Sequence, residues 1–289
     1  MQRKIKNMEA KITQRIKQIY PQLGSSSQKI ADYLLKEELP ASMTLAEIAQ
    51  ACQVSLATVS RFARSLGFKN FSQLKWALLH QLTQNESTNE RVTQADNSLK
   101  VAGKVLAANM TTLKETFALL NEVDLTQAVK LICSAERLAF FGLGGSNIVA
   151  EDAYHKFLRV PLTVLYSSEY HLALLQASRL TAKDCAILIS HTGNNQDILL
   201  LAKVLRQNQV PAIVITSDPE SPLVRLGTIC FYSISGNLHF QSQAFISMTS
   251  QLALTDCLYL LTARSFGTAA TVIYDHQQAI VDLRHHFKN

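Results

Sequence analysis

Apolar residues recur every three or four positions along the first eighty residues of the chain. Ile12, Ile16 and Ile19 form one such series, and Ile30 and Leu34 belong to the next. This spacing predicts amphipathic helices, and the segment lacks the alternation of apolar and polar residues that marks a strand. The first part of the chain is therefore predicted to be all helical.

A polar stretch then interrupts the pattern. Residues 83–98 are almost wholly polar and cannot bury enough surface to fold around themselves. A chain of 289 residues also exceeds the size at which a single core usually stops growing. We therefore predict a helical domain over residues 1–82, a linker over 83–98 and a second domain over 99–289.

The second domain alternates helical stretches with short runs rich in β-branched and aromatic residues. Runs such as Ala-Ile-Leu-Ile are continuously apolar, which is typical of strands that helices cover on both faces. The alternation predicts an α/β, doubly wound, five-stranded parallel sheet whose ligand site lies at the carboxyl ends of the strands. The predicted strands are 137–143, 161–167, 184–190, 211–217 and 228–234, and the last helices are 241–264 and 270–286.

Composition and charge narrow the class of protein. The net charge is +6, and basic residues outnumber acidic ones by more than two to one in the first eighty positions, which suits a polyanionic partner. The five cysteines are scattered, without a Cys-x-x-Cys pair, and are expected to be reduced. We find neither a membrane-spanning run nor a signal peptide, and expect a cytoplasmic protein with no metal and no cofactor.

Residues 44–68 carry the densest local signal. Thr44 followed by Glu47 is a capping box that starts one helix, and Ser55 followed by Thr58 caps the next. Between them, Gln53 occupies a turn position where many such motifs place Gly because the backbone is left-handed. The pattern predicts a helix-turn-helix, with a helical hairpin used for dimerisation as the alternative.

The second helix of this motif is expected to bind a double-stranded DNA operator. Its early residues can reach base edges, and basic residues nearby can contact phosphates. The predicted DNA-binding residues are Ser55, Ala57, Thr58, Ser60, Arg61, Arg64 and Lys69, and Lys75 is a further candidate for a phosphate contact.

Two strand ends in the second domain can form an anion-binding site. The first predicted strand ends in Gly142-Leu-Gly-Gly-Ser-Asn147, and the third in Ser190-His-Thr-Gly-Asn-Asn-Gln-Asp197; each leads into a helix. Glycines, hydroxyls and amides at a helix start suit a phosphate group. The predicted ligand-binding residues are Gly144, Ser146, Ser190, His191, Thr192, Gly193 and Asn195.

One alternative to a phosphate cradle at these loops is a dinucleotide-binding site, and a further loop, after the fourth strand, has its own interpretation. A dinucleotide fold lacks its third glycine, because Val149 occupies that position, but Glu169 lies near the place of its acidic residue. The turn over residues 216–223, after the fourth strand, is interpreted as ordinary loop chemistry.

Taken together, these motifs resemble the MurR/RpiR family of transcription regulators over nearly the whole chain. The resemblance implies a sugar isomerase (SIS) sensor domain of flavodoxin-like fold, in which Ser146, Ser190, Thr192 and Asn195 contact the phosphate of a sugar phosphate. It implies a regulator of carbohydrate metabolism genes. We expect a homodimer or homotetramer built through the sensor domains, with paired heads on a partly palindromic operator.

The alternative function is a sugar-phosphate isomerase. Isomerisation needs a base with a pKa near neutrality. In the segment where the family commonly carries Glu, this chain has Gln241 or Gln243, which cannot act as a base. The other candidates, each more readily explained as a structural or ligand-contacting residue, are His171, His191, His239 and Glu169. We therefore expect a sensor and not an enzyme.

Overall fold

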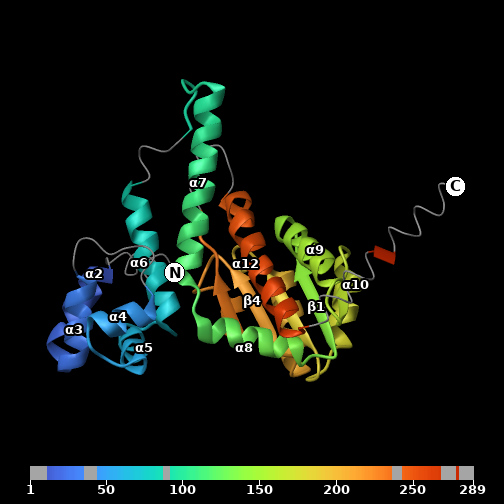
Figure 1. Cartoon of the computed structure of the whole chain (residues 1–289), viewed down its shortest axis with the longest axis horizontal. Helices are drawn as coiled ribbons and strands as arrows, with labels where there is room; N and C mark the ends of the chain where they lie inside the picture. Colours follow the sequence, from blue (N-terminus) through green and yellow to red (C-terminus); the bar gives the residue numbers. More distant parts are fainter. Residues whose placement is uncertain (1–11, 36–43, 87–91, 236–242, 268–277, 280–289) are drawn as a thin grey trace. The chain divides into compact units, whose positions relative to one another are not determined.

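The computed structural model describes residues 12–35, 44–86, 92–235, 243–267 and 278–279. The chain divides into two compact units. The first comprises Met1–Asn121 with Gly236–Gln243, and the second comprises Glu122–Ser235 with Ala244–Asn289. Figure 1 shows helices alone in the first unit and a sheet flanked by helices in the second.

The first unit is helical, as predicted. Its described elements are α2 (Ile12–Ile19), the 3-10 helix η1 (Tyr20–Gln22), α3 (Ser25–Leu34), α4 (Leu45–Ala51), α5 (Leu56–Ser65), α6 (Phe71–Glu86) and α7 (Ser98–Leu119). Helix α6 continues four residues into the polar stretch that begins at residue 83, and α7 begins where that stretch ends.

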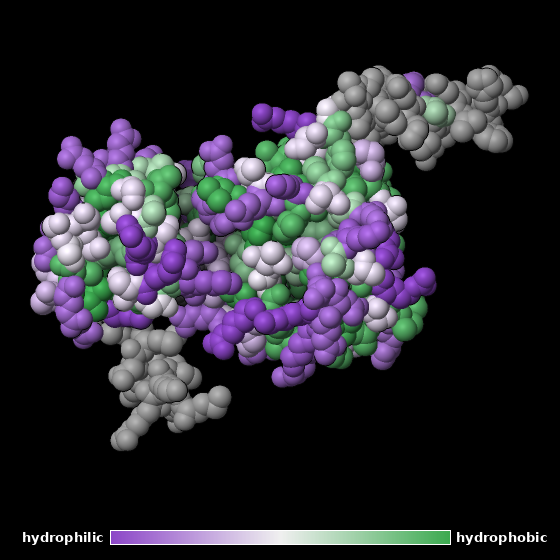
Figure 2. All heavy atoms as spheres, turned by 90° about the horizontal axis from the view of Figure 1, so that it is seen from below, coloured by the Kyte–Doolittle hydropathy of each residue, from purple (hydrophilic) through white to green (hydrophobic). Residues whose placement is uncertain are grey.

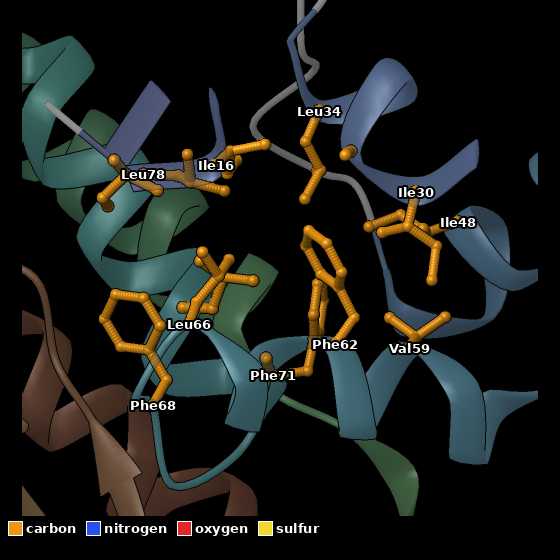
Figure 3. Close-up of a cluster of buried hydrophobic side chains, with 14 of the residues drawn as sticks. Ile16, Ile30, Leu34, Ile48, Val59, Phe62, Leu66, Phe68, Phe71 and Leu78 are labelled. Atoms are coloured by element: carbon orange, nitrogen blue, oxygen red, sulfur yellow. The ribbon is translucent and has the colours of Figure 1, made fainter. Parts of the chain in front are cut away.

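The core of this unit, hereafter the head core, gathers side chains from α2 to α6 (Figure 3). Phe62 of α5 is 1% exposed, and Ile48 of α4 and Val59 of α5 are fully buried beside it. Burial of each such side chain stabilises the fold by about 1.5–3 kcal/mol. Ile16 of α2 and Ile30 of α3, each part of a series with helical spacing, therefore face one common core.

The second unit contains the predicted five-stranded parallel sheet. Its order is β2-β1-β3-β4-β5, and every neighbouring pair is parallel. The elements are α8 (Glu122–Cys133), β1 (Arg137–Gly142), α9 (Gly145–Phe157), β2 (Thr163–Tyr166), α10 (Tyr170–Ser178), β3 (Cys185–Ile189), α11 (Gln196–Gln207), β4 (Ala212–Thr216), η2 (Pro222–Arg225), β5 (Ile229–Tyr232) and α12 (Gln243–Ser265). The strands are one to three residues shorter at their ends than the apolar runs that predicted them.

Helices cover both faces of this sheet, which explains why its strands are continuously apolar. Ala139 and Phe141 of β1 pack with residues of α10 and α11. The intervening Phe140 points to the other face, where its ring centroid lies 5.2 Å from that of Phe157 of α9. Phe157 in turn lies 5.6 Å from the ring of Tyr259 of α12.

Two further expectations concern the last predicted helix and the absence of a membrane-spanning run. The predicted helix over 270–286 lies outside the described residues except for positions 278–279, which are helical. Within the described ranges, no helix is both long enough and apolar enough to span a bilayer.

Candidate functional site

Helix α4 begins and ends as the sequence predicts for the first helix of a helix-turn-helix. The Thr44 amide donates to Glu47 Oε2 at 2.6 Å, and the Glu47 amide donates to Thr44 Oγ1 at 3.2 Å. These hydrogen bonds hold the pKa of the Glu47 carboxyl below its usual value. At the other end Gln53 is left-handed, with φ of 54°. The Val54 amide closes the turn on the Ala49 carbonyl at 2.9 Å.

Helix α5 presents a hydrogen-bonded series of polar side chains at its amino end. Ser55 Oγ accepts from the Thr58 amide at 3.2 Å and lies 2.9 Å from Thr58 Oγ1. The Arg61 guanidinium donates to the same Thr58 Oγ1 at 3.2 Å. Three residues predicted to contact DNA are therefore held together at the start of the helix.

The opposite side of α5 fixes which residues face outward. Val59, Phe62 and Ala63 are buried in the head core, so the remaining positions face away from it. Of the predicted DNA-binding residues, Thr58 and Ser60 are half-buried; the exposed ones are Ser55, Ala57, Arg61, Arg64 and Lys69.

Leu56 was not among the predicted contacts, yet its side chain is 52% exposed at the first position of α5. An apolar residue in this place can contact a thymine methyl group. The signal was present in the sequence, because Leu56 directly follows the capping serine.

The expectation that Lys75 contacts a DNA phosphate is wrong. Its side chain belongs to α6 and is 3% exposed, and its ammonium donates to the Ala118 carbonyl in the last turn of α7. Burial lowers the pKa of Lys75 to about 8. The sequence could not show this, because the carbonyl partner is 43 positions away.

The loop after β1 requires its glycines. A side chain at Gly142 would place Cβ 2.3 Å from the Ser146 carbonyl oxygen, and Gly144 has φ of 57°. The loop turns so tightly that the Ser146 amide donates to the Leu143 carbonyl at 3.2 Å and the Asn147 amide to Gly144 at 3.0 Å. These two amides are engaged in the turn and are not free to bind an anion. Ser146 itself is 8% exposed.

The loop after β3 is organised by the residues predicted to bind phosphate. Ser190 Oγ accepts from the Gly193 amide at 3.1 Å, and Thr192 Oγ1 accepts from the Asn194 amide at 3.4 Å. Asn195 caps α11, its Oδ1 accepting from the Asp197 amide at 2.8 Å. Side-chain oxygens thus occupy the loop amides, and phosphate oxygens are acceptors of the same kind.

The segment after β4 supports this loop and is more than an ordinary turn. Thr216 Oγ1 donates to the His191 carbonyl at 3.1 Å, and the Leu223 amide donates to the Gly193 carbonyl at 3.2 Å. Gly193 has φ of 57°, and a Cβ there would lie 2.2 Å from Ser221 Oγ. Sequence reasoning did not assign this supporting role, although the density of hydroxyl residues over 216–221 was visible.

His191 connects the loops through its imidazole. Its Nδ1 lies 3.0 Å from Ser217 Oγ and 3.0 Å from Ser247 Oγ of α12. Ser217 Oγ lies 2.7 Å from Ser233 Oγ, which follows β5. Burial lowers the pKa of His191, with Asp218 acting weakly in the opposite direction. The neutral imidazole is therefore the favoured form in this environment.

The sheet topology brings the two predicted loops to one place. β1 and β3 are neighbours, with Gly142 paired to Ile189 at their carboxyl ends. The chain leaves β1 toward β2 on one side and leaves β3 toward β4 on the other, which is the switch point where open α/β sheets bind ligands. Residues 143–146 and 190–195 therefore flank a common crevice position.

Glu169 has a structural role that argues against catalysis. Its carboxylate accepts from the His171 amide at 3.0 Å and the Leu172 amide at 2.7 Å, which caps α10. These hydrogen bonds lower the pKa of Glu169. A carboxylate held in this way is a poor base near neutral pH. His239 and Gln241 lie outside the described residues, and among those described no cluster of three potential metal ligands occurs.

The two units define a class of protein. A helix-turn-helix with its second helix facing outward is a DNA-reading element, and the parallel sheet with hydroxyl-rich loops at its switch point is a ligand-binding domain. Residues 10–85 match the helix-turn-helix domain of the rpiR family, and residues 130–261 match the SIS domain.

Curated relatives share both parts. A helix-turn-helix transcriptional regulator of Haemophilus influenzae is 32% identical over 86% of this chain and 89% of its own. The transcriptional regulator HexR of Escherichia coli is 32% identical over 80% of this chain and 79% of its own. The chain belongs to the RpiR family and is a transcription regulator with a SIS domain.

A solved structure of similar fold covers nearly the whole chain. The NanR protein of Vibrio vulnificus, complexed with ManNAc-6P, aligns with a TM-score of 0.59 at 22% identity. The alignment covers 94% of this chain and 98% of NanR. This likeness establishes the fold of the two units.

Proposed function

We propose that the chain represses or activates carbohydrate genes by binding a DNA operator through α5 and a phosphorylated sugar through the loops after β1 and β3, without converting the sugar. The observation that carries the effector assignment is the pair of loops at adjacent strand ends, the glycine-rich one after β1 and the one after β3 that holds Ser190 and Thr192. A function of this kind is carried out in the cytoplasm, where the operator is.

The DNA contacts are expected to divide by position on α5. Ser55, Thr58 and Arg61 lie at the amino end, the part of a recognition helix that reaches base edges in the major groove. Arg64 lies farther along α5 and Lys69 follows the helix; both suit phosphates, where basic side chains contribute affinity but little sequence preference. Ala57 and Ser60 have short side chains, so they are expected to bring the helix backbone close to the bases.

The effector is expected to replace internal hydrogen bonds of the β3 loop. Phosphate oxygens can accept from the amides of Gly193 and Asn194, which now donate to Ser190 and Thr192. The two hydroxyls are then released to donate to the phosphate, and Ser146 lies in the first turn of α9, which follows the neighbouring strand β1. The NanR complex with ManNAc-6P supports a sugar phosphate as the class of ligand.

DNA binding is tested with Arg61→Ala in the full chain. We expect specific operator affinity to fall about tenfold, because a good bidentate base contact is worth about 1–3 kcal/mol of discrimination. Affinity for unrelated DNA should change much less. Lys203→Ala, at an exposed lysine of α11, is the matched control. Equal loss on operator and unrelated DNA would remove Arg61 from the base contacts.

Effector binding is tested by thermal shift against a panel of sugar phosphates, with Ser190→Ala beside the natural chain. A ligand at one hundred times its Kd stabilises the folded state by about 2.7 kcal/mol, so a binder gives a clear shift. Ser190→Ala should abolish the shift and keep DNA binding. Ser178→Ala, which removes an exposed hydroxyl on α10, is the control. An unchanged shift in Ser190→Ala would contradict the assignment of the loop.

The isomerase alternative is decided on the same samples. Isomerisation through proton transfer between neighbouring carbons would exchange a carbon-bound hydrogen of the sugar with deuterium from D₂O. We expect the ligand to be recovered chemically unchanged and without deuterium. Conversion or deuterium uptake would make the chain an enzyme.

A further inference from the structure

Helix α7 carries an exposed apolar stripe. Apolar side chains also reach the surface elsewhere, as on the face drawn in Figure 2, and this is normal for a folded protein. On α7 the pattern is ordered: Leu99 is 83% exposed, Leu106 64%, Met110 57% and Phe117 72%. At 100° per residue these four positions fall within about 40° of one another around the helix axis.

The opposite side of the same helix is buried and partly polar. Thr112 is 1% exposed and Glu115 is 7% exposed, together with Ala108 at 7%. A surface helix ordinarily buries its apolar side and exposes its polar side. In α7 the most apolar side is the exposed one, which indicates a surface on which a partner packs.

The stripe is symmetric about Ala108. Leu99 and Phe117 each lie nine positions from Ala108, and Leu106 and Met110 each lie two positions from it. Two copies of α7 packed antiparallel about a two-fold axis at this level would place Leu106 against Met110 of the partner subunit. Leu99 would lie against Phe117 of the partner subunit by the same symmetry.

Glycine and charge positions on α7 agree with this arrangement. Gly103 lies in the interior of a 22-residue helix, where Gly lowers stability, and a Cβ there would meet nothing within 4 Å in its own chain. The symmetry places it beside Leu113 of the partner subunit. The exposed Lys114 would lie beside the exposed Ala102 of the partner subunit, which is the position symmetric to it, and not beside another lysine.

The area of the stripe suffices for a stable contact. Taking about 200 Å² for each fully exposed side chain, the four exposed fractions expose roughly 550 Å² per copy. A pair would bury about 1,100 Å², above the threshold of about 1,000 Å² expected of a specific interface. We propose that α7 is a self-association surface through which two copies of this chain pair in antiparallel fashion.

Charge substitutions in the full chain test the pairing and its direction. In L106E/M110E, carboxylates would face carboxylates across the interface, and we expect the solution mass measured by light scattering to fall to half that of the natural chain. In L106E/M110K, each carboxylate would face an ammonium of the partner, and the mass should stay that of the natural chain. A parallel pair would instead place like charges together in the second variant.

The controls separate folding from association. L172E/L175E changes two exposed leucines of α10, 54% and 62% exposed, and should leave the mass unchanged. Circular dichroism should show the natural helix content in every variant, since only exposed positions change. An unchanged mass for L106E/M110E, or an equal loss in both α7 variants, would overturn the proposal.

The proposal of this interface and the proposal of the effector can be refuted independently. The proposal extends the homo-oligomer expected of the regulator but does not depend on a sugar phosphate. The L106E/M110E variant should keep the thermal shift given by the effector while losing cooperative binding to a palindromic operator. If the masses are as expected but no sugar phosphate gives a thermal shift, the interface is supported and the effector is rejected.

Discussion

Left-handed residues show how single positions govern the helix ends of this protein. Gln53 (φ of 54°), Gly67 (φ of 87°) and Gln209 (φ of 58°) each follow a helix and close it by the same pair of hydrogen bonds. Only one of the three is glycine, although a Cβ is unfavourable in this conformation. In the turn of the helix-turn-helix, the surrounding structure therefore holds Gln53 in a backbone conformation that is unfavourable for a residue with a Cβ.

Gln53→Gly is expected to stabilise the head by about 0.5–1 kcal/mol, because glycine relieves the left-handed strain and loses part of the gain to entropy. The single tryptophan of the chain, Trp76, lies on α6 of the head and reports its unfolding in urea by fluorescence. The control Gln50→Gly, one turn earlier in α4, should destabilise by about 1 kcal/mol. A lower urea midpoint for Gln53→Gly would contradict the strain.

At the scale of elements, the ligand domain is organised by contacts among the ends of four elements. His191 follows β3, Ser217 follows β4, Ser233 follows β5 and Ser247 belongs to α12, and their side chains form one hydrogen-bonded series. Such a series couples the β3 loop to the first turns of α12. Binding at the loop can therefore shift α12 only by as much as the ligand distinguishes the two arrangements.

The lowered pKa of His191 predicts a pH dependence of stability. Above the ordinary pKa of 6.5, both the folded and the unfolded chain hold a neutral imidazole, and the folded state keeps its full stability. As the pH falls from 6.5 through the lower folded-state pKa, the unfolded chain binds the proton first, and stability is lost.

We expect the melting temperature of the ligand domain, followed by far-ultraviolet circular dichroism, to fall between pH 7.5 and 5.5. His191→Gln, which cannot titrate, should lose part of this dependence, whereas the exposed His155→Gln of α9 should not. The same slope in His191→Gln as in the natural chain would show that the titrating group lies elsewhere.

At the scale of the whole molecule, the two units are expected to unfold separately. Asp184, 2% exposed, anchors the start of β3 and accepts two hydrogen bonds from Arg137 at 2.8 and 2.7 Å. It also accepts from the Thr181 amide at 2.7 Å. Arg137 and Asp184 both belong to the second unit.

Arg137→Ala should lower the stability of the ligand domain by about 2–4 kcal/mol, since it leaves a buried carboxylate without its charged partner. The transition followed by Trp76 fluorescence should not move, because that residue belongs to the first unit. Arg179→Ala, at an exposed arginine whose backbone carbonyl accepts from Arg137, is the control. A shared shift of both transitions would show that the units unfold together.

Much of the fold could be predicted from the sequence because its determinants are local. The capping of α4 by Thr44 and Glu47, the capping of α5 by Ser55, and the apolar spacing of the head core involve residues a few positions apart. The five strands were found from their apolar runs, and the loops after β1 and β3 were singled out by their glycines and hydroxyls. Such patterns act through neighbouring backbone groups, so they can be seen in one dimension.

The sequence by itself therefore determined the helical head, the order of helices and strands, and the glycine and hydroxyl residues of the loops after β1 and β3. Only the tertiary structure decided that Lys75 is buried against α7, that Ser221 closes on Gly193, and that Ser247 reaches His191. These partners lie 43, 28 and 56 positions apart, so nothing in the local pattern links them. The reason is physical: burial and hydrogen bonding depend on which distant surfaces meet, and that is settled by packing the whole chain.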